Sequence, residues 1–98
     1  MFVGTLELDV LLGDVHSLKE RRGLVRPVVA DLRRRFEVTV AEVGMHDLHR
    51  RSLIGVAVVG ADPARCTHLL DSCERAVAAR PELELLSARR TLRDTDDD

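Results

Sequence analysis

The fold is decided first by FVGTLELDVLL, residues 2–12, in which apolar and polar side chains alternate. Leu6 and Leu8 occupy even positions, whereas Glu7 and Asp9 occupy odd ones. Because successive side chains of a β-strand point to opposite faces, this period of two predicts a strand with one buried and one exposed face. We therefore expect one face of the sheet to stay uncovered.

A helix is expected soon after this strand. Residues 17–20, Ser-Leu-Lys-Glu, have the form of a capping box, in which the serine and glutamate side chains accept hydrogen bonds from unpaired amides at a helix start. The following apolar side chains fall within one arc of a helical wheel: Leu18, Val25, Val28, Val29, Leu32 and Phe36. Pro27 removes one backbone hydrogen bond, so we expect a kink or a restart there.

Further strands and a second helix follow. Residues 38–43 and 53–59 are rich in β-branched or apolar side chains and predict two strands on either side of a polar segment, 44–52. Asp62 and Pro63 predict the start of a second helix.

That helix should end near Arg80, before Pro81, and Leu83 should begin a last strand with a bulge near residues 85–86. The order βαββαβ predicts an α+β, ferredoxin-like fold: a four-stranded antiparallel sheet with two helices on one face. We expect a single domain over residues 1–93 and an acidic C-terminal tail, 94–98.

Composition excludes several classes of function. Only Phe2 and Phe36 are aromatic among 98 residues, which removes most surfaces that stack on bases or flat cofactors. Cys66 and Cys73 lack the spacing of a metal or redox pair, so both should pack in the core. Neither a signal peptide nor a transmembrane segment is recognisable, so we expect a cytoplasmic protein with no membrane partner, no cofactor and no bound metal.

Two motifs support a family assignment. The first, residues 16–22, is His-Ser-Leu-Lys-Glu-Arg-Arg; the second begins with Val-Ala-Glu-Val-Gly at 40–44 and continues into Asp-Leu-His-Arg-Arg at 47–51. With the element order, they resemble the bacterial YlxP-like family, a domain of unknown function (503), over residues 1–93. The resemblance implies a ferredoxin-like fold and a gene context of translation initiation and ribosome maturation factors, but no established activity. His49 stands where that family usually has tryptophan.

Basic residues form the main candidate site, and most of them follow one side of the first helix. The candidate phosphate contacts are Lys19, Arg22, Arg26, Arg33, Arg34, Arg50 and Arg51. The alternative interpretation is a solvated helix face with intrahelical ion pairs. Because the strands carry no stacking aromatics, any RNA should bind through the first helix and the 44–52 segment.

The polar segment holds three further candidates: His46, Asp47 and His49. Imidazoles beside a carboxylate can bind a metal, shuttle protons or contact RNA, but they equally suit an ordinary polar connection. No third metal ligand and no catalytic set are recognisable, so we expect a protein that is not an enzyme.

The net charge of the whole chain argues against a polyanionic partner, but the distribution of that charge along the sequence favours one. The chain has a formal net charge of -2, but four of its 17 acidic residues lie in 94–98, so residues 1–93 carry 15 basic and 13 acidic groups, a net of +2. We therefore expect a factor that docks on ribosomes or structured RNA, and we expect removal of residues 94–98 to tighten that binding. The alternative is a module that forms a homodimer or binds a protein through apolar residues of the open sheet face: Val3, Leu11, Leu53 and Val59.

Overall fold

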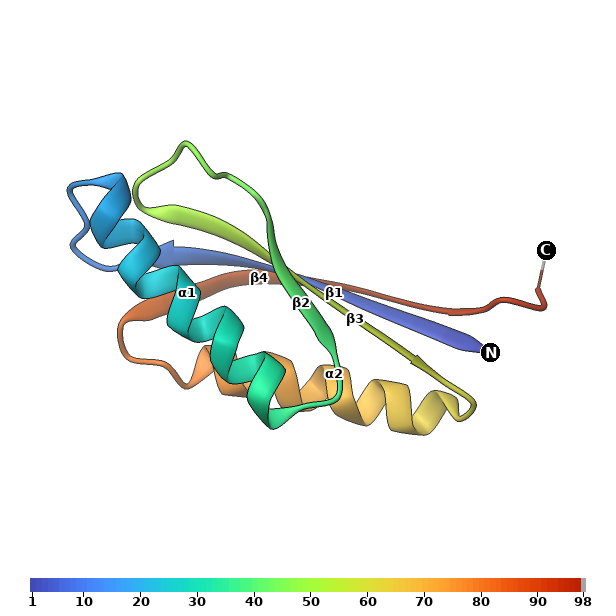
Figure 1. The fold of residues 1–98 in the computed structure, drawn as a ribbon. Coiled ribbons are helices and arrows are strands. Elements are labelled where there is room, and N and C mark those ends of the chain that lie inside the picture. Colours follow the sequence, from blue (N-terminus) through green and yellow to red (C-terminus); the bar gives the residue numbers. More distant parts are fainter. Residues whose placement is uncertain (98) are drawn as a thin grey trace.

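The fold comes from a computed structural model of the chain, which describes residues 1–97 (Figure 1). Its elements are β1 (Phe2–Leu12), α1 (Leu18–Arg35), β2 (Thr39–Gly44), β3 (Arg51–Gly60), α2 (Pro63–Ala78) and β4 (Leu83–Asp94). The strands form one antiparallel sheet in the order β2-β3-β1-β4, and both helices cover the same face. The predicted ferredoxin-like α+β fold is confirmed.

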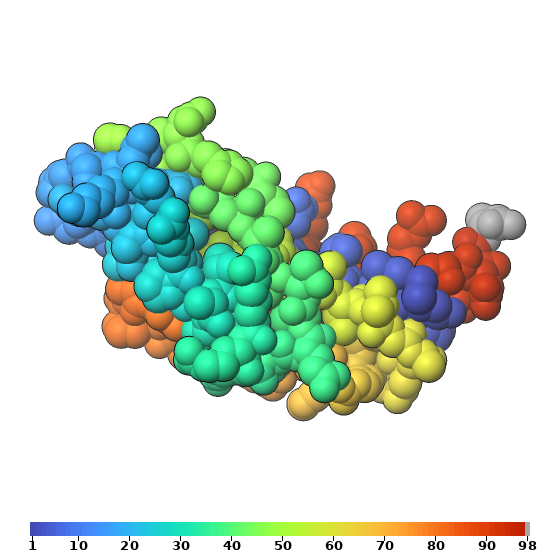
Figure 2. Space-filling view, viewed as in Figure 1, coloured from blue at the N-terminus to red at the C-terminus, as the bar shows by residue number. Residues whose placement is uncertain are grey.

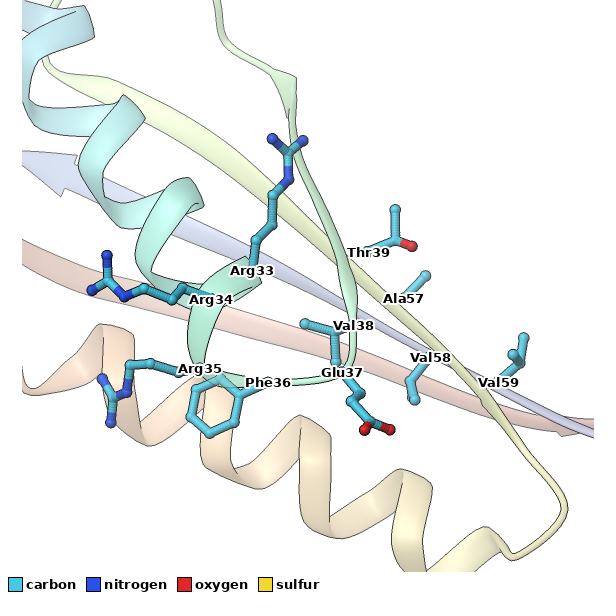
Figure 3. Close-up of a pocket in the computed structure, with 10 residues that line it drawn as sticks. All are labelled: Arg33, Arg34, Arg35, Phe36, Glu37, Val38, Thr39, Ala57, Val58 and Val59. Atoms are coloured by element: carbon cyan, nitrogen blue, oxygen red, sulfur yellow. The ribbon is translucent and has the colours of Figure 1, made fainter.

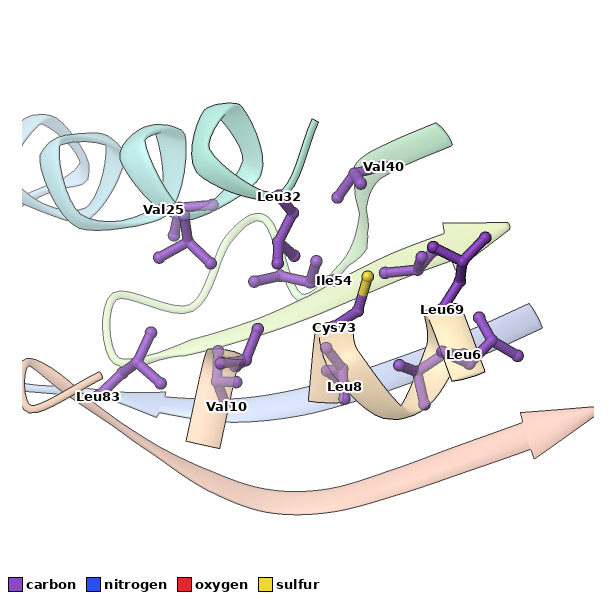
Figure 4. Packing of buried hydrophobic residues seen from close by; sticks show 14 of the residues in the cluster. Leu6, Leu8, Val10, Val25, Leu32, Val40, Ile54, Leu69, Cys73 and Leu83 are labelled. Carbon is purple, nitrogen blue, oxygen red and sulfur yellow. The ribbon is translucent and has the colours of Figure 1, made fainter. Parts of the chain in front are cut away.

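The core fills the space between the sheet and the helices (Figure 4). Even-numbered side chains of β1 and β3 point into it, because the period of two places them all on the covered face. Cys66 and Cys73 are free thiols and fully buried, as predicted. Burial raises the pKa of the Cys73 thiol to about 11, since the thiolate would lose its solvation.

The start of α1 follows the capping motif. The Ser17 hydroxyl accepts a hydrogen bond from the Glu20 amide at 3.1 Å, and the Glu20 carboxylate accepts one from the His16 amide at 3.1 Å. The two side chains thereby satisfy two backbone donors at the helix start.

Of the two outcomes expected at Pro27, the restart is wrong, because α1 runs continuously from Leu18 to Arg35, and the kink stays a prediction. Pro27 and Gly23, four residues earlier, both lie on the exposed side of the helix. Gly23 has no side chain, and no neighbouring atom lies within 4 Å of the place a Cβ would occupy. The structure therefore does not require a glycine at position 23 for space, and α1 continues through Pro27 with the loss of one backbone hydrogen bond.

The polar segment 44–52 is shorter than predicted. Gly44 ends β2, and Arg51 and Ser52 begin β3, which leaves residues 45–50 as the hairpin loop. Ser52 is completely buried, because its hydroxyl donates to a carboxylate oxygen of Glu42 at 2.5 Å. A serine can occupy a core position when its hydroxyl is hydrogen-bonded, and the apolar sequence pattern alone does not predict such a position.

The C-terminal strand contains the predicted bulge. Asp9 pairs with Ser87 but Val10 pairs with Leu85, so Leu86 is the extra residue. β4 continues through Asp94, one residue past the expected boundary of the domain, and Asp98 lies outside the described residues. In the part of the chain that the structure describes, no helix is long and apolar enough to span a bilayer.

Candidate nucleic-acid interface

A buried arginine organises the end of the molecule where α1 begins. Arg21 is only 3% exposed and starts the buried row of α1, whereas Leu18, predicted to lie in this row, is 48% exposed. A buried guanidinium requires hydrogen-bond acceptors around it. The β2–β3 hairpin supplies them.

Arg21 donates to five oxygen atoms of that hairpin. Its Nε reaches the Leu48 carbonyl at 2.6 Å, and Nη2 reaches the carbonyls of Met45 at 2.8 Å and Arg51 at 2.9 Å. Nη1 donates to Glu42 Oε1 at 3.2 Å, and Nη2 also donates to Glu42 Oε2. The α1 side chain therefore ties the hairpin loop to the helix at several points along the loop.

Glu42 is the anionic partner in this cluster. Burial disfavours its carboxylate, but hydrogen bonds from Arg21 and Ser52, helped by the charge of Arg21 and to a smaller extent of His46, outweigh burial and lower the pKa of Glu42. His46 Nε2 lies 3.7 Å from Glu42 Oε1. The carboxylate therefore stays ionised at neutral pH and neutralises Arg21.

Three of the predicted phosphate contacts form a row on the exposed side of α1. Lys19, Arg22 and Arg26, here called the basic row, are all exposed, and none has an ion-pair partner within residues 1–97. With Gly23 and Pro27 they line a shallow hollow of about 340 Å³. The missing side chain at Gly23 leaves the helix backbone accessible between the three cations.

A groove between α1 and the edge strand β2 continues this surface. It has a volume of about 540 Å³ and is lined by Arg22, Val25, Arg26, Val29, Ala30, Arg33, Ala41 and Glu42. Arg33 lies at its far end and donates from Nε to the Val40 carbonyl at 3.0 Å. Arg33 therefore belongs to the same groove but already has a hydrogen-bond partner.

Two other predicted contacts lie apart from the basic row. Arg34 pairs with Asp31 at 2.8 Å, and Arg51 pairs with Asp9 on the uncovered face of the sheet at 2.6 Å. Figure 3 shows a hollow at the end of α1, where Arg34 and Arg35 point away from Arg33. Asp9 neutralises Arg51, whereas Arg34 shares the single carboxylate of Asp31 with Arg35 and Arg80 and is therefore only partly neutralised.

The hairpin loop contributes Arg50 and the polar candidates. Arg50 is exposed and donates to the Gly13 carbonyl at 3.2 Å, with no carboxylate partner among the described residues. His46, Asp47 and His49 are also exposed. Across residues 1–97, no group of three metal-ligating side chains is found.

The basic row and the start of the acidic tail lie at opposite ends of the molecule. The first turns of α1 lie beside the hairpin loop at one end, and the chain termini lie at the other (Figures 1 and 2). The Thr95 amide donates to the Met1 carbonyl at 2.8 Å, which holds the start of the tail near the N-terminus. The longest dimension of the molecule is 46 Å, which is several Debye lengths at physiological salt, so charges at the two ends are largely screened from each other.

The sequence prediction missed Arg21, Glu42 and Ser52. A signal was present, because Arg21 lies in one motif of the family resemblance and Glu42 in the other. The helical wheel gave no reason to bury an arginine, and the contact across 21 residues exists only after folding.

Comparison with known proteins agrees with the sequence motifs. The family model described as "Protein of unknown function (DUF503)" matches residues 3–90, which is most of the chain. A curated relative, "Uncharacterized protein YlxP" of Bacillus subtilis (strain 168), is 26% identical over 82 residues, covering 84% of this chain and 89% of that protein.

Proposed function

The chain belongs to the DUF503 family of proteins of unknown function, and we propose that it is a non-enzymatic cytoplasmic factor that docks on structured RNA of the ribosome through its basic end. The contacts would come from the basic row together with Arg50. The gene context of the YlxP-like family supports a role in translation or ribosome maturation.

The observation that carries this proposal is the set of unpaired cations. Most other arginines of the chain already have a carboxylate or carbonyl partner, as Arg21, Arg33 and Arg51 do. The basic row has no such partner within residues 1–97, so phosphate contact would not require breaking an existing ion pair. Each neutralised phosphate would also release counterions, which favours binding.

The backbone beside these cations offers a contact that suits RNA. The Gly23 carbonyl cannot accept the usual helical hydrogen bond from residue 27, because proline has no amide hydrogen. Gly23 is one of the residues that line the hollow with Lys19, Arg22 and Arg26. A ribose 2′-hydroxyl can donate to a carbonyl, and DNA has no such group.

The loop clamp supports the same proposal. Arg21 holds the loop backbone at Met45 and Leu48 and the start of β3 at Arg51, so Arg50 would bind phosphate from an ordered loop. A preordered contact loses less conformational entropy on binding than a flexible one.

The experiment is co-sedimentation with purified ribosomal subunits, followed by fluorescence anisotropy on a structured fragment of ribosomal RNA at several salt concentrations. Arg22→Glu with Arg26→Glu should abolish co-sedimentation. In the wild type, four phosphate contacts predict that the logarithm of affinity falls with that of salt with a slope of about -3. Single replacement of Arg22 by Gln should reduce that slope by about 1.

A matched control makes the same change of charge on the other helix. Arg65→Glu with Arg75→Glu alters two exposed arginines of α2 and should leave RNA affinity within about twofold of the wild type. The proposal fails if the wild type does not bind at low salt, or if the α1 and α2 double variants lose affinity equally.

A further inference from the structure

The uncovered face of the sheet has its own chemistry, distinct from that of the basic end. Its odd-numbered β1 side chains lie beside those of β3, from Val3 opposite Val59 to Leu11 opposite Arg51. We call this surface the open face. Val59 is 65% exposed and Val43, on β2, is 50% exposed, so apolar side chains project from it.

Most polar groups of the open face satisfy one another. Arg51 forms two hydrogen bonds to Asp9, at 3.0 and 2.6 Å. Arg89 lies directly opposite Glu7, with Nε 3.7 Å from its carboxylate. The hydroxyls of Thr5 and Thr91 are also paired. A partner with many charges would find few unpaired charges to bind here, so a partner with a similarly self-paired, partly apolar surface fits better.

Two charged side chains of β4 on the open face have no ion-pair partner among the described residues. Glu84 lies opposite Leu11 at one end of the strand, and Arg93 lies opposite Val3 at the other. Both are exposed, and neither has an ion-pair partner in the described part of the chain. Their signs are opposite and they lie at opposite ends of one strand.

This arrangement matches a second copy of the same face. A two-fold axis that lies between the faces and crosses the strands at right angles turns each strand end for end over its own counterpart. Glu84 of each copy then lies near Arg93 of the other. The same rotation stacks the apolar β2–β3 half of one copy on that of its partner.

The axis would pass over a hollow in the centre of the face. The midpoint between Val3 and Leu11 on β1 is Glu7, which pairs with Gly55 on β3. Both residues line a hollow of about 380 Å³ whose other lining residues are Thr5, Leu6, Thr39, Ala41, Val43, Val56 and Ala57. The hollow is lined mainly by small side chains, and valines project from the same face. The projecting valines of one copy could therefore pack into the hollow of a second copy.

The area is sufficient for such an interface. With a rise of about 3.3 Å per residue and about 4.8 Å between strands, the four strands cover roughly 600 Å² before surface relief is counted. Stable interfaces bury roughly 600 to 1,000 Å² per partner. From the area, the self-paired polar groups and the two end charges, we infer that the protein forms an antiparallel, face-to-face homodimer through the open face.

The experiment is sedimentation velocity of the full chain between about 1 µM and about 1 mM. As the concentration rises, the wild type should sediment as a species with twice the 10.9 kDa mass of one chain. Glu84→Arg and Arg93→Glu, each alone, should raise the dimer dissociation constant about tenfold, because two attractive pairs become repulsive. The two changes together should restore it to near the wild-type value.

Ala57→Glu adds a test that does not depend on the end charges. A carboxylate in the central hollow would be buried without a partner, so this variant should stay monomeric while its circular dichroism remains that of the wild type. Arg75→Glu, on α2, is the matched control and should dimerise normally.

Three outcomes would overturn the inference: a wild type that stays monomeric at the highest concentration, a dimer indifferent to Ala57→Glu, or a double reversal no tighter than either single one. None of them bears on RNA binding, because the basic row lies on α1, behind the sheet.

Discussion

Replacing Arg21 with methionine should destabilise the fold strongly and loosen the hairpin loop. Arg21 is 3% exposed and its partner Glu42 is 17% exposed, so the variant leaves a largely buried carboxylate without its cation. Removing one member of a buried pair costs about 3 to 5 kcal/mol, and the remaining exposure of Glu42 places the expected loss near 3 kcal/mol. That is a large part of the roughly 5 to 10 kcal/mol expected for a chain of this size.

The assay is urea unfolding followed by circular dichroism, with Glu42→Gln and the double variant completing a cycle. Because the double variant leaves no buried charge, it should be more stable than the sum of the two single losses predicts, by about 1 to 3 kcal/mol. Arg21→Lys is the control that keeps the charge but loses the planar, two-pronged contact, and it should recover only part of the stability.

The pH dependence follows from the same pair. The pKa of Glu42 is lower in the folded state than in the unfolded chain, so the pair stabilises the fold fully above the unfolded pKa. That stability is lost as pH falls through the folded pKa. The acid-side loss should be smaller in Arg21→Met. Additive losses in the cycle, or a cost below about 1 kcal/mol for Arg21→Met, would refute this account of the clamp.

Three further predictions concern other parts of the molecule. Gly4→Ala should cost about 1 to 3 kcal/mol in a thermal melt, because a Cβ at Gly4 would lie 2.9 Å from Leu70 Cδ1 in the core. The Cys73 thiol, with its pKa raised to about 11, should react with Ellman's reagent at pH 8 only at the rate of unfolding, and rapid labelling would contradict its burial. Deleting residues 95–98 should change RNA affinity by less than about twofold, because the tail begins beside Met1, far from the basic row; tighter binding would mean that the tail reaches it.

Local patterns were sufficient to predict most of the fold. Three features depend on interactions within a few residues and can therefore be predicted from the sequence: the period of two in β1, the Ser17 cap and the Asp62-Pro63 start of α2. At Pro27 the local rule failed, because α1 continues through this proline, on the exposed side of the helix, despite the loss of one backbone hydrogen bond.

The candidate site was only partly predictable, because charge on a residue does not reveal its partners. The same seven basic side chains divide in the folded protein. Five have no carboxylate partner within residues 1–97: Lys19, Arg22, Arg26, Arg33 and Arg50. Arg34 shares Asp31 with two other arginines, and Arg51 pairs with Asp9. Arg51 could not be separated from Arg50 in the sequence. In the sheet it begins β3 and faces Asp9, because strand pairing brings residues 42 positions apart together.

The order of elements, the covered face of the sheet and the excess of arginine on one helix can be predicted without a structure, since they follow from short-range periodicity and composition. Which charges stay free, in contrast, depends on how the chain folds. Arg21 is buried because the β2–β3 hairpin surrounds it with five oxygen acceptors. The start of the acidic tail is remote from the basic row because antiparallel pairing of β1 and β4 places Met1 and Asp94 together at the other end. Both outcomes depend on contacts between distant segments, which no local pattern encodes.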